Sequence, residues 1–141
     1  MYRDTVTIFN RYHTANGDVW YPTVLTGVDL NIDHAAIMAK YGENAQDNSK
    51  LHIRLDGDTV GGKTYVTPKE YQSLLSTDGY ITFNPGADFD FYCEGSWTTT
   101  VNDNDYLDGF YNYMNQRYDH VFAITAVAKY SVIPHFEILG R

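Results

Sequence analysis

Residues 57–64 carry the pattern with the most specific chemistry in this sequence. They read Gly-Asp-Thr-Val-Gly-Gly-Lys-Thr and match the phosphate-loop pattern G-x-x-x-x-G-K-[ST]. In a phosphate loop, the Lys-Thr pair begins a helix whose N-terminal amides hold the phosphates. Here Pro68 would lie in the first turns of that helix, and it disfavours the helical region for Thr67. We therefore expect a glycine-rich loop rather than a nucleotide site.

Acidic clusters and scattered histidines are the remaining candidates for a metal or catalytic site. The acidic clusters lack the glycine and glutamate spacing of a calcium-binding EF-hand loop, so we interpret them as turn and helix-cap residues. Among the histidines, only His135 shares a predicted strand face with an acid two residues away, Glu137. Cys93 adjoins Glu94, but the spacings C-x-x-C, H-x-x-x-H and G-x-S-x-G are missing. The sequence predicts no catalytic residue, cofactor or metal, and no enzyme.

Composition and charge narrow the class of protein. A chain of 141 residues has the length of one domain and can bury its own core. Lysine and arginine number 10 against 18 aspartates and glutamates, and the net charge of −8 argues against broad binding to nucleic acid phosphates. The 13 tyrosines suit a surface that a protein partner covers. A single cysteine, no apolar run of about 18 residues and no signal peptide predict a soluble protein made in a reducing cytoplasm.

The N-terminal third predicts a long, bent β-hairpin. Residues 5–12 and 19–30 are rich in β-branched and aromatic residues, and Asn16-Gly17 between them suits a turn. Pro22 cannot donate a hydrogen bond, so it must lie at an edge or a bulge, and Gly27 indicates a bend that curls the sheet. Residues 31–49 then form a connection too long for an ordinary turn, which is typical of a functional loop.

The rest of the chain predicts further strands and two helices. Residues 50–55 alternate strictly, with Leu51, Ile53 and Leu55 on one face. Thr67, Pro68 and Glu70 form a capping box for a short helix near 68–75. Apolar spacing that includes Leu107, Phe110 and Met114 predicts a longer helix near 104–118, weakened by Gly109. The remaining predicted strands span residues 80–83, 88–94, 119–133 and 135–139. The third of these strands, 119–133, has Phe122, Ile124, Ala126 and Ala128 on one face. The fold class is mainly β with helical insertions (α+β).

Four stretches, in the same order along the chain, resemble one known family. They are residues 5–10 with 20–28, 51–55 followed by 65–71, 80–95 ending in an acid and a glycine, and 134–141. The order resembles that of the stopper or head-closure proteins of long-tailed bacteriophages, often grouped as minor capsid proteins. Residues 96–118 depart from that family's pattern.

The resemblance implies a small antiparallel β-barrel that forms a homo-oligomeric ring in the neck of the virion, beneath the portal. Such a ring joins the head to the tail, contacts portal or adaptor and tail proteins, and lets DNA pass without specific binding. The long connection between the second and third strands can close the channel, and here it would place Ile37, Met38, Tyr41 and Gly42 near the axis. We expect the aromatic residues Trp20, Tyr21, Tyr111 and Tyr113 at protein interfaces. The resemblance implies no membrane and no small-molecule substrate.

The charge agrees with this interpretation, because an acidic inner wall would repel DNA and let the duplex slide. Two alternatives remain open. A small ligand- or carbohydrate-binding β-barrel module would explain the many aromatic residues, and a nucleotide-binding enzyme would explain residues 57–64.

Overall fold

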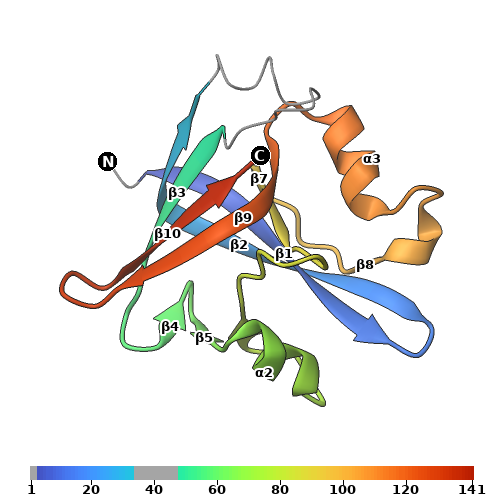
Figure 1. Cartoon of the computed structure of the whole chain (residues 1–141), viewed down its shortest axis with the longest axis horizontal. Coiled ribbons are helices and arrows are strands. Elements are labelled where there is room, and N and C mark those ends of the chain that lie inside the picture. Colours follow the sequence, from blue (N-terminus) through green and yellow to red (C-terminus); the bar gives the residue numbers. More distant parts are fainter. Residues whose placement is uncertain (1–2, 34–47) are drawn as a thin grey trace.

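The chain begins with the long hairpin that the sequence predicts (Figure 1). The computed structural model describes residues 3–33 and 48–141. Strand β1 (Asp4–Thr14) pairs antiparallel with β2 (Gly17–Ile32) around a turn at residues 15–16. The register shifts where Asp4 faces Val28 and Thr5 faces Thr26, which leaves Gly27 as an extra residue at a φ of 65°. The predicted bend at Gly27 is therefore a β-bulge, and the left-handed φ is why glycine occupies it.

Six strands close into an antiparallel barrel. The hydrogen-bonded order is β1, β7 (Phe91–Glu94), β9 (Val121–Tyr130), β10 (His135–Gly140), β3 (Ser49–Arg54) and β2, and the β1–β2 pairing completes the circuit. A short strand, β8 (Val101–Asn102), pairs with β2 outside the barrel. Pro22 pairs with Phe9 of β1 on one side, and on its other side it lies in the stretch of β2 between the β8 and β3 partners, where no strand pairs with it. The predicted mainly β barrel with helical insertions is confirmed.

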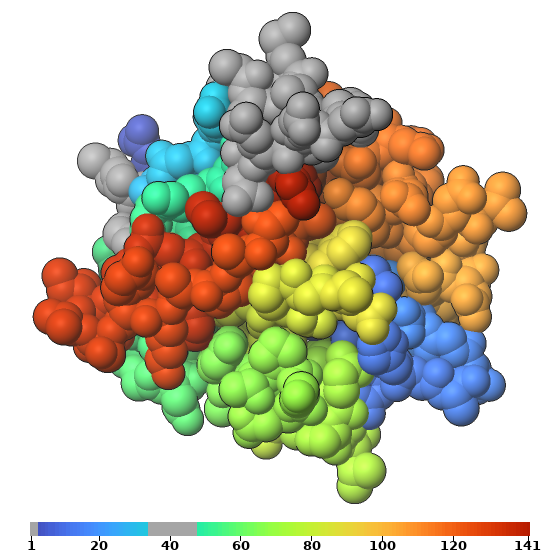
Figure 2. Space-filling view, viewed as in Figure 1, coloured from blue at the N-terminus to red at the C-terminus, as the bar shows by residue number. Residues whose placement is uncertain are grey.

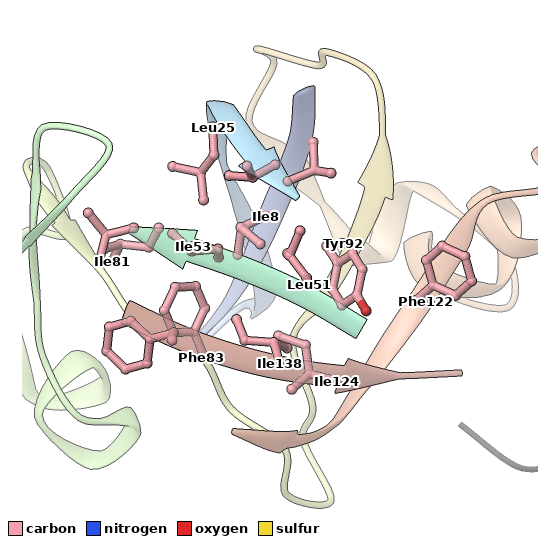
Figure 3. Close-up of a cluster of buried hydrophobic side chains, with 14 of the residues drawn as sticks. Ile8, Leu25, Leu51, Ile53, Ile81, Phe83, Tyr92, Phe122, Ile124 and Ile138 are labelled. Atoms are coloured by element: carbon pink, nitrogen blue, oxygen red, sulfur yellow. The ribbon is translucent and has the colours of Figure 1, made fainter. Parts of the chain in front are cut away.

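The barrel core is aliphatic and aromatic (Figure 3). Leu51, Ile53 and Leu55 point inward as the alternating pattern predicts. The other inward side chains come from every strand of the barrel and from the segment around β6, and include Ile8, Leu25, Ile81, Phe83, Tyr92, Phe122 and Ile138. Burial of this many large side chains is the main source of the barrel's stability.

Strand β9 does not keep one face inward along its whole length. Gly140 pairs with Ile124 but Leu139 pairs with Ala126, so Thr125 is the extra residue of a bulge. Phe122 and Ile124 are buried, whereas Ala126 and Ala128 are not, and the residue that packs on the core beyond the bulge is Val127. The predicted single face of 122, 124, 126 and 128 was therefore wrong beyond Ile124, because a bulge exchanges the two faces of a strand.

A small sheet and a short helix lie beside the barrel. Strand β4 (Thr59–Val60) forms a hairpin with β5 (Lys63–Tyr65), which pairs in parallel with β6 (Tyr80–Ile81). Helix α2 (Pro68–Ser73) begins with the predicted capping box: the Glu70 amide donates to Thr67 Oγ1, and the Glu70 carboxylate accepts from the Thr67 amide. The helix ends at Ser73, two residues before the predicted end.

The second predicted helix begins later than the sequence indicates. Helix α3 (Phe110–Arg117) follows a 3-10 turn, η1 (Asp103–Asp105), and Gly109 between them has a φ of 87°. Phe110 and Met114 are buried as predicted, but Leu107 lies before the helix and is fully exposed. The left-handed Gly109 stops any helix from running through residues 106–109.

Candidate functional site

The predicted gating residues Ile37, Met38, Tyr41 and Gly42 lie outside the described residues. The two ends of their segment are well defined. The Asp33 amide donates to the Asn48 carbonyl at 2.7 Å, and the Asn48 amide donates to the Gly140 carbonyl at 2.9 Å. The connection therefore leaves and re-enters the barrel at one point of its rim, beside the end of the last strand.

The four predicted interface residues occupy different environments around a second hydrophobic core. Trp20 is fully buried against Phe9 and Phe91, so its ring belongs to that core and is not available to a partner. Tyr21 and Tyr111 are half-buried, and Tyr113 on α3 is exposed. The prediction of an interface role for Trp20 is corrected by its burial, and the other three residues keep accessible surface.

Asp103 connects this second core to α3. Its Oδ1 accepts from the Trp20 indole Nε1 at 2.8 Å and from the Phe110 amide at 2.9 Å. The carboxylate thereby satisfies a free amide at the helix start and lies where the helix dipole favours negative charge. The sequence indicated a helix-cap role for this acidic cluster but placed the helix start beside it, whereas Asp103 bonds an amide seven residues later, across the chain reversal at Gly109.

Arg11 lies at the edge of the same core and forms one wall of a cavity of about 370 Å³. Its guanidinium carbon lies 4.5 Å from the centre of the Trp20 ring and 5.3 Å from that of Phe89. Its nearest acids, Asp18 at 3.6 Å and Asp88 at 3.9 Å, are too far for good hydrogen bonds. The Arg11 Nε is buried without a hydrogen-bond partner in the described part of the chain. The cavity therefore has a positively charged donor group beside aromatic rings.

The rest of the cavity is lined by one aromatic wall and a polar rim. Phe89 and Tyr111 meet edge to face with ring centroids 4.8 Å apart. The other lining residues are Trp20, Ala87, Asp103, Asp108, Gly109 and Asn112. An aromatic wall with a guanidinium and carboxylates at the rim suits an uncharged ligand or peptide with apolar groups and carbonyl or hydroxyl oxygens.

Asp90 is a fully buried acid that joins three segments of the barrel. Its Oδ1 accepts from the Arg11 amide at 2.8 Å, and its Oδ2 accepts from Asn10 Nδ2 at 2.9 Å and the Asn84 amide at 3.0 Å. Burial raises the pKa of Asp90 to about 7, although these hydrogen bonds and the charge of Arg11 oppose the rise. The sequence placed Asp90 in the predicted strand 88–94, within an acidic cluster interpreted as turn and helix-cap residues, and its burial was not predicted.

Residues 57–64 do not form a phosphate loop. Gly61 and Gly62 make the two-residue turn of the β4–β5 hairpin, so Lys63 begins a strand and not a helix. The Lys63 ammonium donates to Thr23 Oγ1 at 2.8 Å, and burial lowers its pKa although Asp78 opposes this. The predicted glycine-rich loop is confirmed in the form of a hairpin.

One polar cluster on the outside of the barrel joins residues far apart in the sequence. His52 Nε2 lies 3.1 Å from Glu137 Oε1, and His135 Nε2 lies 3.7 Å from Glu137 Oε2. The sequence paired His135 with Glu137 but missed His52, because cross-strand neighbours cannot be read from one strand. Across residues 3–33 and 48–141, no three His, Cys, Asp or Glu side chains are placed to bind a metal ion together.

Cys93 is buried in the second core, and burial raises the pKa of its thiol to about 12. In the described ranges, neither helix is long and apolar enough to span a membrane.

Comparison with known proteins identifies a family for the chain. A search of the curated proteins gave no match, and a search of the solved structures gave none either. One family matches residues 1–141, the whole of the sequence. The chain belongs to the Family of unknown function (DUF6751).

Proposed function

We propose that this protein is a structural component of the neck of a bacteriophage virion, where it forms a ring that joins head to tail and closes the DNA channel. The observation that carries the proposal is a closed antiparallel barrel with a long β2–β3 connection whose two ends meet at one rim. A stopper-like ring needs both features, namely a rigid body that packs against its copies and a long segment that can reach the axis. The ordered resemblance of four stretches to head-closure proteins supports the same assignment.

Charge is a second line of support. The chain carries a net charge of −8, and DNA carries about one negative charge per 1.7 Å of helix axis. A ring with an excess of carboxylates would therefore let the duplex pass without gripping it. The protein would be made in the bacterial cytoplasm and incorporated into the virion.

The test is an early stop codon in this reading frame of a phage that encodes it. We expect lysates with separate heads and complete tails, in which the heads have lost their DNA, and rescue by the protein supplied from a plasmid. Intact infectious particles without the protein would overturn the proposal. The neighbouring reading frames give an independent check, since portal and capsid genes are expected upstream and tail genes downstream.

Gating needs a narrower experiment. Deletion of residues 35–45 removes most of the β2–β3 connection but leaves its base at Asp33 and Asn48 intact. We expect joined particles that leak DNA, and a Leu75→Ser change at an exposed site serves as the matched control. Particles with the deletion that still retain their DNA would exclude the gating role while leaving the joining role in place.

The second candidate is a small ligand- or carbohydrate-binding module. The cavity beside Arg11 favours it, because aromatic rings and carboxylates are common partners of sugar rings and hydroxyl groups. Binding to a glycan array that a change of Tyr111 abolishes would support this candidate over the neck protein.

A further inference from the structure

The turn between β9 and β10 carries two strongly exposed aliphatic side chains. Val132 is 96% exposed and Ile133 is 77% exposed. At the base of the turn, the Tyr130 and His135 rings stack with centroids 4.8 Å apart. Figure 2 shows this hairpin projecting from the body at the left edge of the view. Adjacent exposed aliphatic residues on a projecting, braced turn indicate a contact with another protein.

The cavity beside Arg11 has the complementary properties. It offers the Phe89 and Tyr111 rings for apolar side chains, and the Arg11 guanidinium, whose Nη1 lies 3.6 Å from Asp18 and 3.9 Å from Asp88. Arg11 is only 18% exposed, and a largely buried donor group gains most from a new acceptor. Next to the rim residue Asp108, Leu107 is fully exposed and extends the apolar surface.

We propose that the β9–β10 turn of one copy docks into the Arg11 cavity of the next copy, head to tail. The inference rests on the proposed ring and names its two contact surfaces. Val132 and Ile133 would pack on Phe89 and Tyr111, and carbonyl oxygens of the turn would accept from Arg11.

Charge favours a second copy as the occupant. Asp103 and Asp108 line the cavity against one arginine, and Asp88 lies 3.9 Å from that arginine, so the rim is negative. Lys129 precedes Tyr130 at the end of β9, close to the turn. Arg54 lies opposite His135 on the neighbouring strand β3. Positive groups beside the turn would therefore approach the negative rim, which steers association and fixes its direction.

The two surfaces lie toward opposite ends of the molecule. In Figure 1 the β9–β10 turn is at the left of the long axis, whereas β8 and α3, beside the cavity, are at the right. Contact between two different surfaces is heterologous, and such a contact produces a ring when the rotation between copies closes. A single repeated contact of this kind would suffice to assemble the proposed ring.

Paired cysteines test the contact directly. One chain carries Val132→Cys in the turn, and a second carries Ala87→Cys at the cavity. The two chains are mixed under mild oxidation at up to about 1 mM, which approximates the local concentration of copies held together in one assembly. They should form a disulfide-linked heterodimer. The native Cys93 is fully buried and does not interfere. The control replaces Ala87→Cys by Leu75→Cys, which is exposed but does not line the cavity, and should give no link above background.

Blocking variants test the direction of assembly. Val132→Asp with Ile133→Asp removes the apolar turn, and Ala87→Trp fills the cavity. Each alone should weaken self-association by about tenfold or more, and their equimolar mixture should stop at a dimer that joins the intact turn to the intact cavity. Circular dichroism verifies that both variants fold.

Equal linking in the control pair, or no link at Ala87, would overturn the inference. If assemblies or virions form although this contact does not, the inference is overturned while the proposed neck function remains intact. Displacement of the turn by a sugar that occupies the cavity would instead support the carbohydrate-binding candidate and contradict both proposals.

Discussion

Asp90 makes the stability of the protein depend on pH in a way that one substitution can isolate. The pKa of this buried carboxyl is raised from 3.8 to about 7, mainly because burial penalises the ionised form. Since the folded pKa lies above the unfolded one, the folded chain binds a proton more tightly between these values. The stabilisation by the neutral acid is full below about pH 4 and is lost as the pH rises toward 7. At about 1.4 kcal/mol per pH unit, the whole difference corresponds to roughly 4 kcal/mol.

Asp90→Asn replaces the acid by a side chain of the same shape that cannot ionise. The quantity to follow is the difference between the free energies of unfolding of the native chain and of the variant. We expect this difference to fall by about 1.4 kcal/mol per pH unit between about pH 5 and about pH 6.5. The two proteins share every other ionisable group, so taking this difference removes most of the effect of those groups. Urea denaturation followed by tryptophan fluorescence supplies the free energies.

Asp58→Asn is the matched control, because Asp58 is exposed in the β3–β4 connection. It should reproduce the pH dependence of the native chain. If Asp90→Asn also keeps that dependence, then Asp90 is ionised in the folded chain throughout this range and the reasoning from burial fails.

Three further changes test how the fold is held together. Asp103→Ala leaves the Trp20 indole and the Phe110 amide without an acceptor and should cost about 2–4 kcal/mol in urea denaturation, whereas the exposed neighbour change Asp105→Ala should stay within about 0.5 kcal/mol. Gly140→Ala would place a Cβ 2.6 Å from the Tyr92 hydroxyl and 2.9 Å from Phe122 Cβ, so we expect the free energy of unfolding to fall by about 1–3 kcal/mol. An unchanged midpoint of urea denaturation would show that the residues at this end of the barrel can shift at little cost. Thr67→Ala removes the N-cap of α2 and should cost about 1 kcal/mol in thermal unfolding, with Thr99→Ala at an exposed site as the control.

Local signals predicted the elements whose cause is local. The hairpin, the alternating strand β3 and the capping box of α2 each depend on residues within a few positions of one another, and all three are present. The start of α3 was missed because its cap, Asp103, acts across a chain reversal at Gly109. The face exchange in β9 was missed because the bulge at Thr125 exists only in the pairing with β10.

The candidate site was harder to predict than the fold, since its residues meet only through the barrel. Trp20 suits an interface or a core equally well by composition, and its burial is decided by Phe9, Phe91 and Phe110 around it. Arg11 and Asp90 are 79 residues apart in sequence and are joined through the Arg11 amide, so no sequence motif announces them.

One strand links the two surfaces that we propose to meet in the ring. The β7-paired end of β9 lies beside Phe91 and the second core, and its other end carries the turn with Val132 and Ile133. The bulge at Thr125 lies between them, and bulges increase the local twist of a strand. The direction of the turn relative to the cavity is therefore built into β9, and in a head-to-tail ring this direction sets the rotation between neighbouring copies. On this reasoning, a change that removes the bulge would alter the size or closure of the ring before it abolished the contact itself.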